Sequence, residues 1–374
     1  MTIDLSSLTT LRIGGPAERM IEPDTERDLV LGAVDIWRAG DDWLVLGGGS
    51  NMLVADEGVE GTVIRVATRG VRRIDGDRDD RIRVRVAAGE PWDAFVAVTI
   101  HNGWAGVEAL SGIPGSVGAS PIQNIGAYGQ ELSDTLVAVD FLDYDSGDRL
   151  RLTADELELG YRTSSFKRGR RGIVIAVEFD LVPTLDRASL GMPVAYPQLA
   201  AALGVAVGDR VPIGDVRAAV LELRASKGMV LDAADPDSVS AGSFFTNPIV
   251  SENFARSLPA DAPRWAVEQD AAPVVIPLQP GIEVTGSMIS PTPRRVKLSA
   301  AWLIERAGVG KGFALPGSRA AISSKHTLAI TNRGGATSAE VAQLAGFIQT
   351  RVMSEFGVRL HPEPVFVGES LTGD

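Results

Sequence analysis

A glycine turn that directly follows a short apolar run is the first candidate for chemistry. In LGGGSNML, residues 46–53, two glycines fit a dinucleotide-binding fingerprint, but Met52 stands where the third glycine is needed. Residues 54–61 are polar and broken by glycine, so they do not continue as the required helix, and the pattern disfavours a Rossmann site. Two alternatives remain. One is a simple tight turn; the other is an anion-binding nest, in which consecutive backbone N–H groups and the side chains of Ser50 and Asn51 surround a pyrophosphate.

A longer glycine-rich segment, GIPGSVGASPIQNIGAYGQE, occupies residues 112–131. Its glycines, prolines and few charges exclude an ordinary helix or strand. A buried loop of this length would leave its backbone polar groups without partners unless something paired with them. We therefore favour a large ligand lying along the loop over a purely structural loop.

Three further segments carry polar side chains that could act on a ligand. In YRTSSFK (161–167), an arginine, two hydroxyls and an aromatic residue fit an anion clamp or a solvated strand end, next to a basic patch at 168–171. AGSFFTNP (241–248) suggests a serine held at an apolar wall, and LHPE (360–363) places one carboxylate near the end of the sequence. Taken singly, YRTSSFK and LHPE are better explained as ordinary surface structure.

The composition excludes several other chemistries. The chain has 374 residues and no cysteine, which rules out disulfides, thiolate nucleophiles and zinc–cysteine or iron–sulfur sites. Its three histidines lie far apart in the sequence, so we expect no metal site. Lys311 in GVGKGF is followed by glycine where a P-loop needs Ser or Thr, and no G-x-S-x-G elbow occurs. P-loop NTPase and serine hydrolase functions are therefore disfavoured.

Charge and hydropathy are those of a soluble globular protein. Lys and Arg number 36 against 48 Asp and Glu, and the formal net charge of −12 would repel a nucleic-acid backbone. Hydrophobic residues make up 45% of the chain, yet no apolar run approaches the roughly 18 residues of a membrane span. The first residues lack the pattern of a signal peptide. We expect a cytoplasmic protein that binds neither nucleic acid nor membrane.

The elements that must position these segments indicate an α+β fold. Strand-like runs are separated by mixed connections, which is unlike a doubly wound sheet. We predict strands at 43–46, 62–66, 82–87, 136–142, 173–182, 328–331 and 364–367. We predict helices at 28–38, 91–102, 213–227 (with Asp215 as a cap), 296–307 and 338–356.

Taken together and in order, these segments resemble the UDP-N-acetylenolpyruvoylglucosamine reductases, or UDP-N-acetylmuramate dehydrogenases, of peptidoglycan synthesis. The resemblance extends from about residue 8 to residue 368. It is carried by TTLRIGG, LGGGSNML, GIPGSVGASPIQNIGAYGQE, YRTSSFK, GSFFTNP and LHPE. Any one of these motifs is weak, but the ordered set is highly specific. The segment GMPVAYPQL resembles a loop that distinguishes the type I subgroup.

The resemblance implies a fold and a domain organisation. The expected fold is α+β, with the two-subdomain FAD-binding fold of the vanillyl-alcohol-oxidase type and a C-terminal α+β substrate-binding domain. We place the first FAD-binding subdomain at 1–66, joined by a C-terminal strand at about 364–374. The second covers 67–231, with the tyrosine-loop insert at about 186–212, and the substrate-binding domain covers 232–363.

The resemblance also implies which residues bind FAD. In the family, the glycine turn and the long loop wrap the pyrophosphate and the flavin without a Rossmann unit. Covalent attachment in relatives needs His or Cys at the loop; here the loop has neither, so we expect non-covalent FAD. Carried onto this sequence, the cofactor-binding residues are Gly47, Gly48, Gly49, Ser50, Asn51, Gly115, Ser116, Gly118, Ala119, Asn124 and Gly126.

Three catalytic residues carry over by motif. In the family's reaction, hydride from NADPH passes through FAD to an enol ether conjugated to a carboxylate, and negative charge spreads into that carboxylate. Arg162 would stabilise this charge as a fixed cation, and Glu363, if protonated, would donate a hydrogen bond to the same oxygens. Ser243 would deliver the C2 proton. Because a serine hydroxyl is a weak acid, this last role rests on the resemblance.

For the substrates, the resemblance implies small molecules, NADPH and a UDP-sugar, bound by a monomer. Substrate contacts are expected from Tyr196 in the insert, Lys227 in RASKG and Asn247 in FFTNP. Thr246 is a departure, because many family members have lysine there, and this puts the local charge balance in question.

Two alternatives stay open at this point. One is an FAD-dependent sugar or alcohol oxidase of the same fold, which would pass electrons to O₂. The other is a non-catalytic UDP-sugar sensor, against which the presence of Arg162, Ser243 and Glu363 argues.

Overall fold

The N-terminal part of the computed structural model is a four-stranded sheet in the order β1-β2-β5-β3, in which β2 and β3 both run parallel to β5. The model describes residues 3–184, 189–267 and 294–370. The elements of this part are β1 Ile3–Asp4, β2 Pro16–Ile21, α1 Glu26–Ala39, β3 Trp43–Leu46, β4 Met52–Val54 and β5 Val59–Arg65, with a 3₁₀ turn at Leu5–Ser7.

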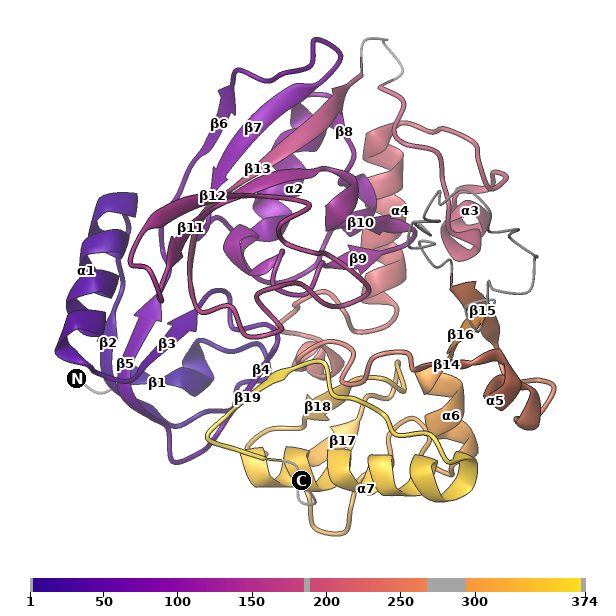
Figure 1. Cartoon of the computed structure of the whole chain (residues 1–374). Coiled ribbons are helices and arrows are strands. Elements are labelled where there is room, and N and C mark those ends of the chain that lie inside the picture. The colour runs from indigo at the N-terminus through magenta and orange to yellow at the C-terminus, as the bar shows by residue number, and fades with distance from the viewer. Residues whose placement is uncertain (1–2, 185–188, 268–293, 371–374) are drawn as a thin grey trace, which may run out of the picture.

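Helix α1 packs against both this sheet and the next. Thr25 begins the helix by accepting a hydrogen bond from the Asp28 N–H, and Gly40 ends it in the left-handed conformation. Its buried residues share one hydrophobic core with strands of the second sheet, and Figure 1 shows the helix beside both sheets. The predicted helix 28–38 and strand 43–46 are confirmed, and the strand predicted at 62–66 begins earlier, at residue 59.

The second sheet is antiparallel, in the order β12-β11-β13-β7-β6, with β8 paired to β13. Helix α2 packs on it through Trp92 and Phe95, whose rings lie against Phe179 of β13. The elements are β6 Val71–Ile74, β7 Ile82–Ala87, α2 Trp92–His101, β8 Trp104–Ala105, β9 Gly126–Ala127, β10 Gln130–Glu131, β11 Leu136–Asp143, β12 Arg149–Thr153 and β13 Gly172–Pro183. Strand β12 was not predicted.

The long glycine-rich segment lies in this part and is built from short turns. Its backbone folds through 3₁₀ turns at Val117–Ala119 and Leu132–Asp134 and the β9–β10 pair, with a further 3₁₀ turn at Glu108–Leu110 just before it. Two helices follow, α3 Pro197–Leu203 and α4 Ile213–Ala225. Asp215 does not cap α4: the helix begins after Pro212, and Asp215 lies inside its first turn.

The C-terminal part has short strands and a long helix. Its elements are 3₁₀ turn Pro236–Ser238, β14 Ile249–Ser251, α5 Glu252–Ser257, β15 Arg264–Val267, β16 Arg295–Leu298, α6 Ala300–Arg306, β17 Ala320–Ile322, β18 Ile330–Asn332, α7 Ser338–Phe356 and β19 Val365–Val367. The predicted helix 296–307 is wrong at its start, because residues 295–298 form the central strand of the sheet β14-β16-β15 and Ser299 caps the helix that follows. The predicted helix 338–356 is confirmed.

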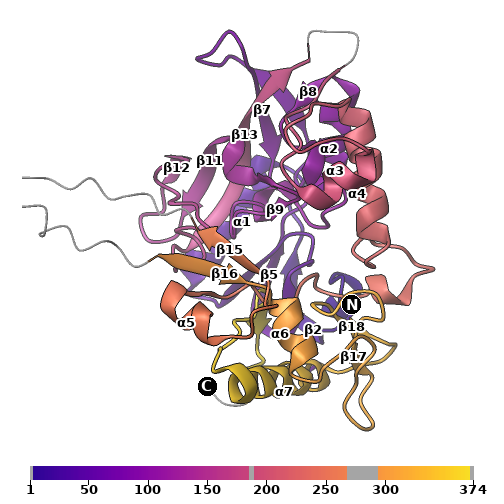
Figure 2. The same cartoon turned by 90° about the vertical axis from the view of Figure 1, so that its right-hand side faces the viewer.

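The C-terminal segment returns to the N-terminal part. Strand β19 runs parallel to β4, with Val365 opposite Met52. Just before it, Phe245 and Pro362 form an antiparallel bridge, and the Glu363 N–H donates to the Phe244 carbonyl at 2.9 Å. Figures 1 and 2 show α7 along the edge of the molecule opposite β6 and β7. The end of the chain thereby brings the C-terminal part against the glycine turn after β3.

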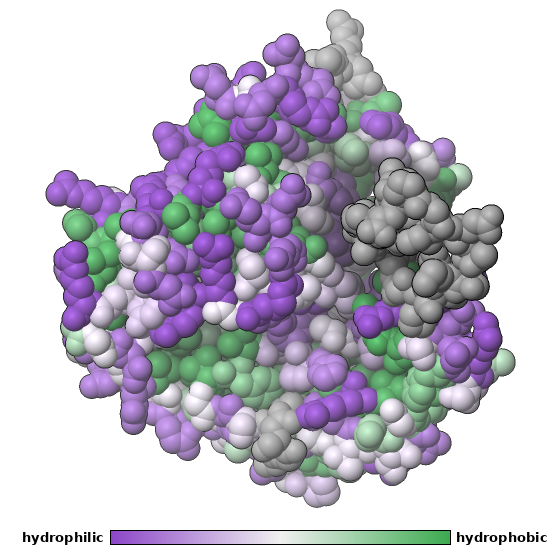
Figure 3. Space-filling view, in the orientation of Figure 1, coloured by the Kyte–Doolittle hydropathy of each residue, from purple (hydrophilic) through white to green (hydrophobic). Residues whose placement is uncertain are grey.

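The surface is largely polar in the view of Figure 3, with purple residues spread over the second sheet and a hydrophobic area lower on the same face. Among the described residues, no helix is both long and apolar enough to cross a membrane. The domain boundaries at 66, 231 and 363 stay predictions. The start of the predicted insert, 186–188, and the end of the predicted C-terminal strand, 371–374, lie outside the described residues.

Candidate active site

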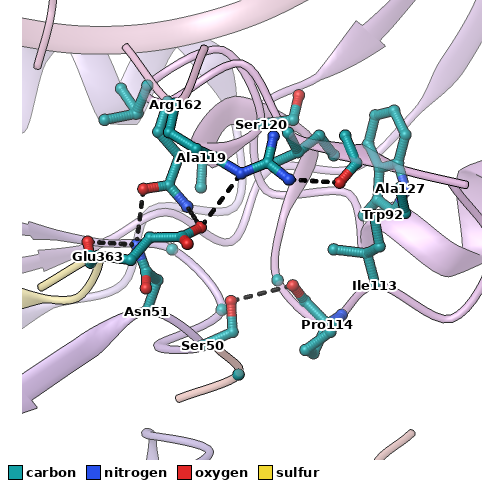
Figure 4. A pocket seen from close by; sticks show the side chains of 18 of the residues that line it. Ser50, Asn51, Trp92, Ile113, Pro114, Ala119, Ser120, Ala127, Arg162 and Glu363 are labelled. Carbon is teal, nitrogen blue, oxygen red and sulfur yellow. Dashed lines mark hydrogen bonds and ion pairs between the residues drawn. The ribbon is translucent and has the colours of Figure 1, made fainter. Parts of the chain in front are cut away.

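A cavity of about 1090 Å³ lies where the three parts of the chain meet. This volume reaches the upper end of the roughly 300–1,000 Å³ of typical small-molecule sites. Both glycine segments, the YRTSSFK segment, the GSFF segment and the C-terminal Glu363 contribute to its wall. Figure 4 shows part of this wall from close by. The five motifs that are separated in the sequence therefore surround one space.

The two glycine segments touch each other backbone to backbone. A Cβ on Gly48 would lie 2.6 Å from the Gly115 Cα, and a Cβ on Gly47 would lie 2.5 Å from the Ser116 Oγ. Gly49 has a φ of 58°, and a Cβ there would meet the Leu8 carbonyl at 2.1 Å. Gly48 and Gly49 therefore require glycine for close backbone approach, as expected of backbone that must also pass close to a ligand, whereas Gly47 approaches only the Ser116 hydroxyl.

The first glycine turn presents unpaired donors to the cavity. The backbone N–H groups of residues 47–51 donate to no other residue in the described part of the chain. Buried N–H groups are almost always paired, and consecutive free N–H groups at a turn form an anion nest. The turn therefore fits a pyrophosphate.

The side chains of Ser50 and Asn51 also make contacts within the protein. The Ser50 hydroxyl donates to the Pro114 carbonyl at 2.9 Å, and the Asn51 amide contacts Gln123 at 3.0 Å. These contacts tie the two glycine segments together (Figure 4). We conclude that their backbone N–H groups, more than their side chains, are available for an anion.

Most of the expected cofactor residues line the cavity, but Asn124 does not share this role. Lining residues are Gly47, Gly48, Gly49, Ser50, Asn51, Gly115, Ser116, Gly118, Ala119 and Gly126. The Asn124 side chain is buried inside the loop, where its Nδ2 donates to the Glu131 carboxylate at 3.0 Å and its Oδ1 accepts from the Ser133 N–H at 3.0 Å. Its side chain shapes the loop instead of facing the cavity.

Arg162 is held as a fixed cation in the cavity wall. Its Nη1 donates to the Asn124 carbonyl at 3.1 Å and its Nη2 to the Gly126 carbonyl at 2.6 Å. Its Nε lies 3.5 Å from the Glu363 Oε1, and Figure 4 shows the two side chains pointing toward each other. Because two carbonyls of the long loop orient the guanidinium, the loop conformation determines where this charge lies.

Glu363 is nearly buried, with 15% of its side chain exposed. Burial raises the pKa of its carboxyl above the ordinary value, although Arg162, Lys167 and a hydrogen bond from Gln123 act in the opposite direction. A carboxyl with a raised pKa can keep its proton and donate a hydrogen bond.

Ser243 lies beside this pair on the adjacent backbone segment. It lines the cavity, and its hydroxyl makes no hydrogen bond to another described residue. The following residue, Phe244, accepts the Glu363 N–H at 2.9 Å. Arg162, Ser243 and Glu363 therefore line the same cavity, and the serine hydroxyl is hydrogen-bonded to no described residue.

The three expected substrate-binding residues line the same cavity. Lys227 donates to the Gln198 Oε1 at 2.8 Å and lies over the ring of Tyr128, and burial lowers its pKa. Tyr196 is 43% exposed and meets Tyr128 edge to face. Asn247 uses its Oδ1 to accept the N–H of Ala300, at the first turn of α6. Its backbone N–H donates to the Tyr161 hydroxyl at 3.3 Å.

Thr246, where the resemblance led us to expect lysine, contacts the C-terminal segment. Its N–H and hydroxyl both donate to the His361 carbonyl, at 3.0 and 3.4 Å. A nearby lysine, Lys297, lines the cavity and lies over the Tyr161 ring.

The sequence reasoning missed several lining residues. Gln123 and Lys167 contact Glu363, and both lie inside motifs that were singled out, so position within a motif was the available signal. Arg224 is buried in the wall with its Nε unpaired among the described residues, and burial lowers its pKa. His326 has a pKa lowered to about 4, chiefly by burial and further by Lys227 and Lys311.

Metal ions have no cluster of ligands in the described ranges. Within residues 3–184, 189–267 and 294–370, no group of three or more His, Cys, Asp or Glu side chains could hold one.

Comparison with known proteins identifies the class. Residues 17–153 match a family model described as an FAD binding domain, in agreement with the nest of free N–H groups and the large cavity. The relatives described below are reductases. The protein is an FAD-dependent oxidoreductase with an α+β fold.

The family follows from the rest of the chain. Residues 235–367 match the model of the UDP-N-acetylenolpyruvoylglucosamine reductase C-terminal domain. The reductases of Leifsonia xyli subsp. xyli and Thermobifida fusca are 60% and 50% identical, each covering at least 98% of both chains. The crystal structure of the Thermus caldophilus reductase superposes with a TM-score of 0.61 at 26% identity, over 98% of both chains. This chain belongs to the UDP-N-acetylenolpyruvoylglucosamine reductase family of peptidoglycan precursor synthesis.

Family membership decides between the alternatives left open by the sequence. Relatives at 44–60% identity over almost the whole chain bear the reductase name. The comparisons therefore favour a reductase over the sugar oxidase and the non-catalytic sensor.

Proposed function

We propose that the protein reduces UDP-N-acetyl-3-O-(1-carboxyvinyl)-glucosamine to UDP-N-acetylmuramate with NADPH. The observation that carries this proposal is the meeting of Arg162, Glu363 and Ser243 beside a turn of free backbone N–H groups in one cavity. An enol ether conjugated to a carboxylate needs a cation, an acid and a proton donor at one place when negative charge develops on it.

FAD fits the cavity on the side of the glycine segments. The N–H groups of residues 47–51 would hold its pyrophosphate, and residues 115–119 and Gly126 would lie along the rest of the molecule. When bound, FAD accepts a hydride from NADPH and supplies it to the double bond of the substrate. Because the loop has no Cys or His, we expect acid denaturation to release the cofactor without a covalent remnant.

Arg162 stabilises the charge that develops on the substrate carboxylate. Its two Nη atoms are held by carbonyl oxygens, so the cation is already in place and needs no reorientation when charge appears. A guanidinium retains further N–H donors beyond these two bonds, and they are available to the substrate.

Glu363 donates a hydrogen bond to the same oxygens in its protonated form, which burial favours. Ser243 delivers the proton to C2. Its hydroxyl has no other described partner, and it is held beside Glu363 by the backbone bond from Glu363 to Phe244. A strongly basic enolate compensates for the weak acidity of the hydroxyl.

The UDP moiety binds on the side of Lys227. Arg224 lies on α4 and Lys227 lies in the turn after it. Both residues line the cavity. Together they offer two cations to a diphosphate in a protein of overall negative charge. Tyr196 and Asn247 contact the substrate from the insert and from the FFTNP segment.

The decisive experiment follows the cofactor colour without oxygen. NADPH should bleach the yellow purified protein, and UDP-N-acetylglucosamine enolpyruvate should then restore the colour, with UDP-N-acetylmuramate as the product. Recovery of colour only after oxygen is admitted would instead support the oxidase. A colourless protein that takes up no FAD would contradict the proposal altogether. We further propose a monomeric, cytoplasmic enzyme.

A further inference from the structure

The Gln123 amide lies at the centre of a small network around Glu363. Its Nε2 lies 2.9 Å from the Glu363 Oε1. Its Oε1 lies 3.0 Å from the Asn51 Nδ2 and 3.1 Å from the Lys167 Nζ. Both of these donors also reach the backbone carbonyl of Glu363, at 3.2 and 3.4 Å. The network joins the two glycine segments, the YRTSSFK segment and the C-terminal segment.

The chemistry of the partners fixes the orientation of each amide. The Lys167 ammonium has only donors, so it must face an oxygen. The Asn51 atom that contacts the Glu363 carbonyl must be the NH₂ nitrogen, because a carbonyl only accepts. Both groups therefore require the Gln123 oxygen on their side. The Gln123 NH₂ is left to donate to Glu363.

This orientation makes the two carboxyl oxygens of Glu363 unequal. Oε1 faces the Gln123 NH₂ at 2.9 Å and the Arg162 Nε at 3.5 Å, both of which are donors. Oε2 makes no hydrogen bond to another described residue. A proton on Oε1 would be repelled by the hydrogens of these N–H donors. A proton on Oε2 avoids this repulsion.

We propose that Gln123 and Lys167 are positioning residues that place the Glu363 proton on Oε2, the oxygen left to donate to the substrate. Gln123 acts directly, by occupying Oε1 with a donor. Lys167 acts through Gln123, by holding the amide in the orientation that has its NH₂ toward Glu363. This inference rests on the proposed function of Glu363 as a hydrogen-bond donor.

Loss of Lys167 should matter because Asn51 alone would then hold the Gln123 oxygen, and the amide would rotate more easily. With its oxygen toward Glu363, the amide would accept the carboxyl proton at Oε1 and draw it away from the substrate. Without the Gln123 side chain, the amide orientation no longer exists for Lys167 to control. The two residues should therefore not act independently.

The experiment measures the two half-reactions separately in Gln123→Met, Lys167→Met and the double variant. Each single variant should slow reduction of the enolpyruvyl substrate by roughly tenfold or more, a part of the 10²–10⁴ that a positioned acid contributes. KM and the rate of cofactor reduction by NADPH should stay near wild type. The double variant should be no slower than Gln123→Met.

Two controls separate positioning from loss of charge. Lys167→Arg supplies another side chain with donors only, and should recover most of the lost rate. Arg72→Met removes one positive charge from an exposed site on β6 and should leave both half-reactions unchanged. Equal effects in Arg72→Met and Lys167→Met would overturn the proposal, as would losses that multiply in the double variant.

An infrared readout tests the proton position without turnover. The C=O stretch of protonated Glu363, identified by its disappearance in Glu363→Gln, should shift to higher wavenumber in Gln123→Met, because its carbonyl oxygen loses a donor. An unshifted band would overturn the inference. If wild-type protein reduces the enolpyruvyl substrate and Gln123→Met matches it in rate and band position, the inference fails while the proposed function stands. If wild type itself fails to reduce that substrate, the proposed function fails first.

Discussion

The Arg162 Nε lies 3.5 Å from the Glu363 Oε1, although Arg162 lies near the middle of the sequence and Glu363 near its end. Arg162 is held by two loop carbonyls, and Glu363 is held by the backbone bond to Phe244 and by Gln123. Each side chain is thus fixed by a different part of the fold. Their meeting creates a site in which a cation and a nearly buried carboxyl face the same ligand.

Replacing Arg162 with lysine should lower the rate of substrate reduction by about 10²–10³, the usual cost of losing a preorganised donor. A lysine cannot bond both loop carbonyls in the guanidinium geometry and also reach the substrate. FAD content and reduction by NADPH should be retained, which stopped-flow absorbance can measure. Wild-type turnover in Arg162→Lys would remove the need for a directional cation.

Ser243→Ala should bind FAD and accept hydride from NADPH, but lose turnover with the enolpyruvyl substrate by about 10²–10³. The hydroxyl is expected to be the proton donor to C2, and alanine has no proton to give. Product deuteration at C2 in D₂O, measured by mass spectrometry in single turnovers, follows that step. If Ser243→Ala turns over like wild type, another group delivers the proton.

Glu363→Gln should abolish most turnover and yet stabilise the folded protein at neutral pH. Burial raises the folded pKa of Glu363 above its unfolded value. Above the unfolded pKa, the unfolded chain ionises more readily than the folded one, so stability falls as pH rises toward the folded pKa. Below the unfolded pKa the carboxyl is neutral in both states, and this difference disappears.

The measurement is the thermal midpoint of wild type and Glu363→Gln between pH 4 and pH 8. The thermal midpoint of Glu363→Gln should exceed that of wild type by a larger amount as pH increases. A gap that narrows with pH would mean that pairing with Arg162 keeps the carboxyl ionised in the folded protein.

His326 should stay neutral at pH 7 and titrate at about pH 4. Its folded pKa lies below the ordinary histidine value of 6.5, so the unfolded state takes up a proton first as pH falls. Stability is therefore lost between about pH 6.5 and pH 4. Proton NMR can follow it, because the chain has only three histidines. His326→Gln should lose this part of the pH dependence, and a titration near 6.5 would contradict the prediction.

Gly48→Ala should weaken FAD binding strongly. The added Cβ would lie 2.6 Å from the Gly115 Cα, so the two glycine segments must move apart. Gly310→Ala is the matched control, since a Cβ there meets nothing within 4 Å. Cofactor dissociation constants from fluorescence titration should rise at least tenfold in Gly48→Ala and remain unchanged in Gly310→Ala. Unchanged affinity in both would remove this contact from cofactor binding.

Local signals in the sequence predicted some elements well and others poorly. Helix α7 matches its predicted bounds because a periodic apolar face follows a capping box formed by Thr337 and Glu340. Strand β16 was assigned to a helix because its apolar residues continue into those of α6, and the cap at Ser299 was the overlooked local signal. Strand β12 is rich in charged residues and forms only by pairing with β11.

The sequence by itself determined the chemistry available to this protein: an order of motifs with an arginine, a serine, a carboxyl and two glycine segments, in a chain without cysteine. Only the tertiary structure decided which groups meet. Gln123 and Glu363 are 240 residues apart, and their contact depends on β19 pairing with β4 and on the conformation of the long loop. Residue type sets what a side chain can donate or accept, but burial and partners, which set its protonation, exist only once distant segments have packed.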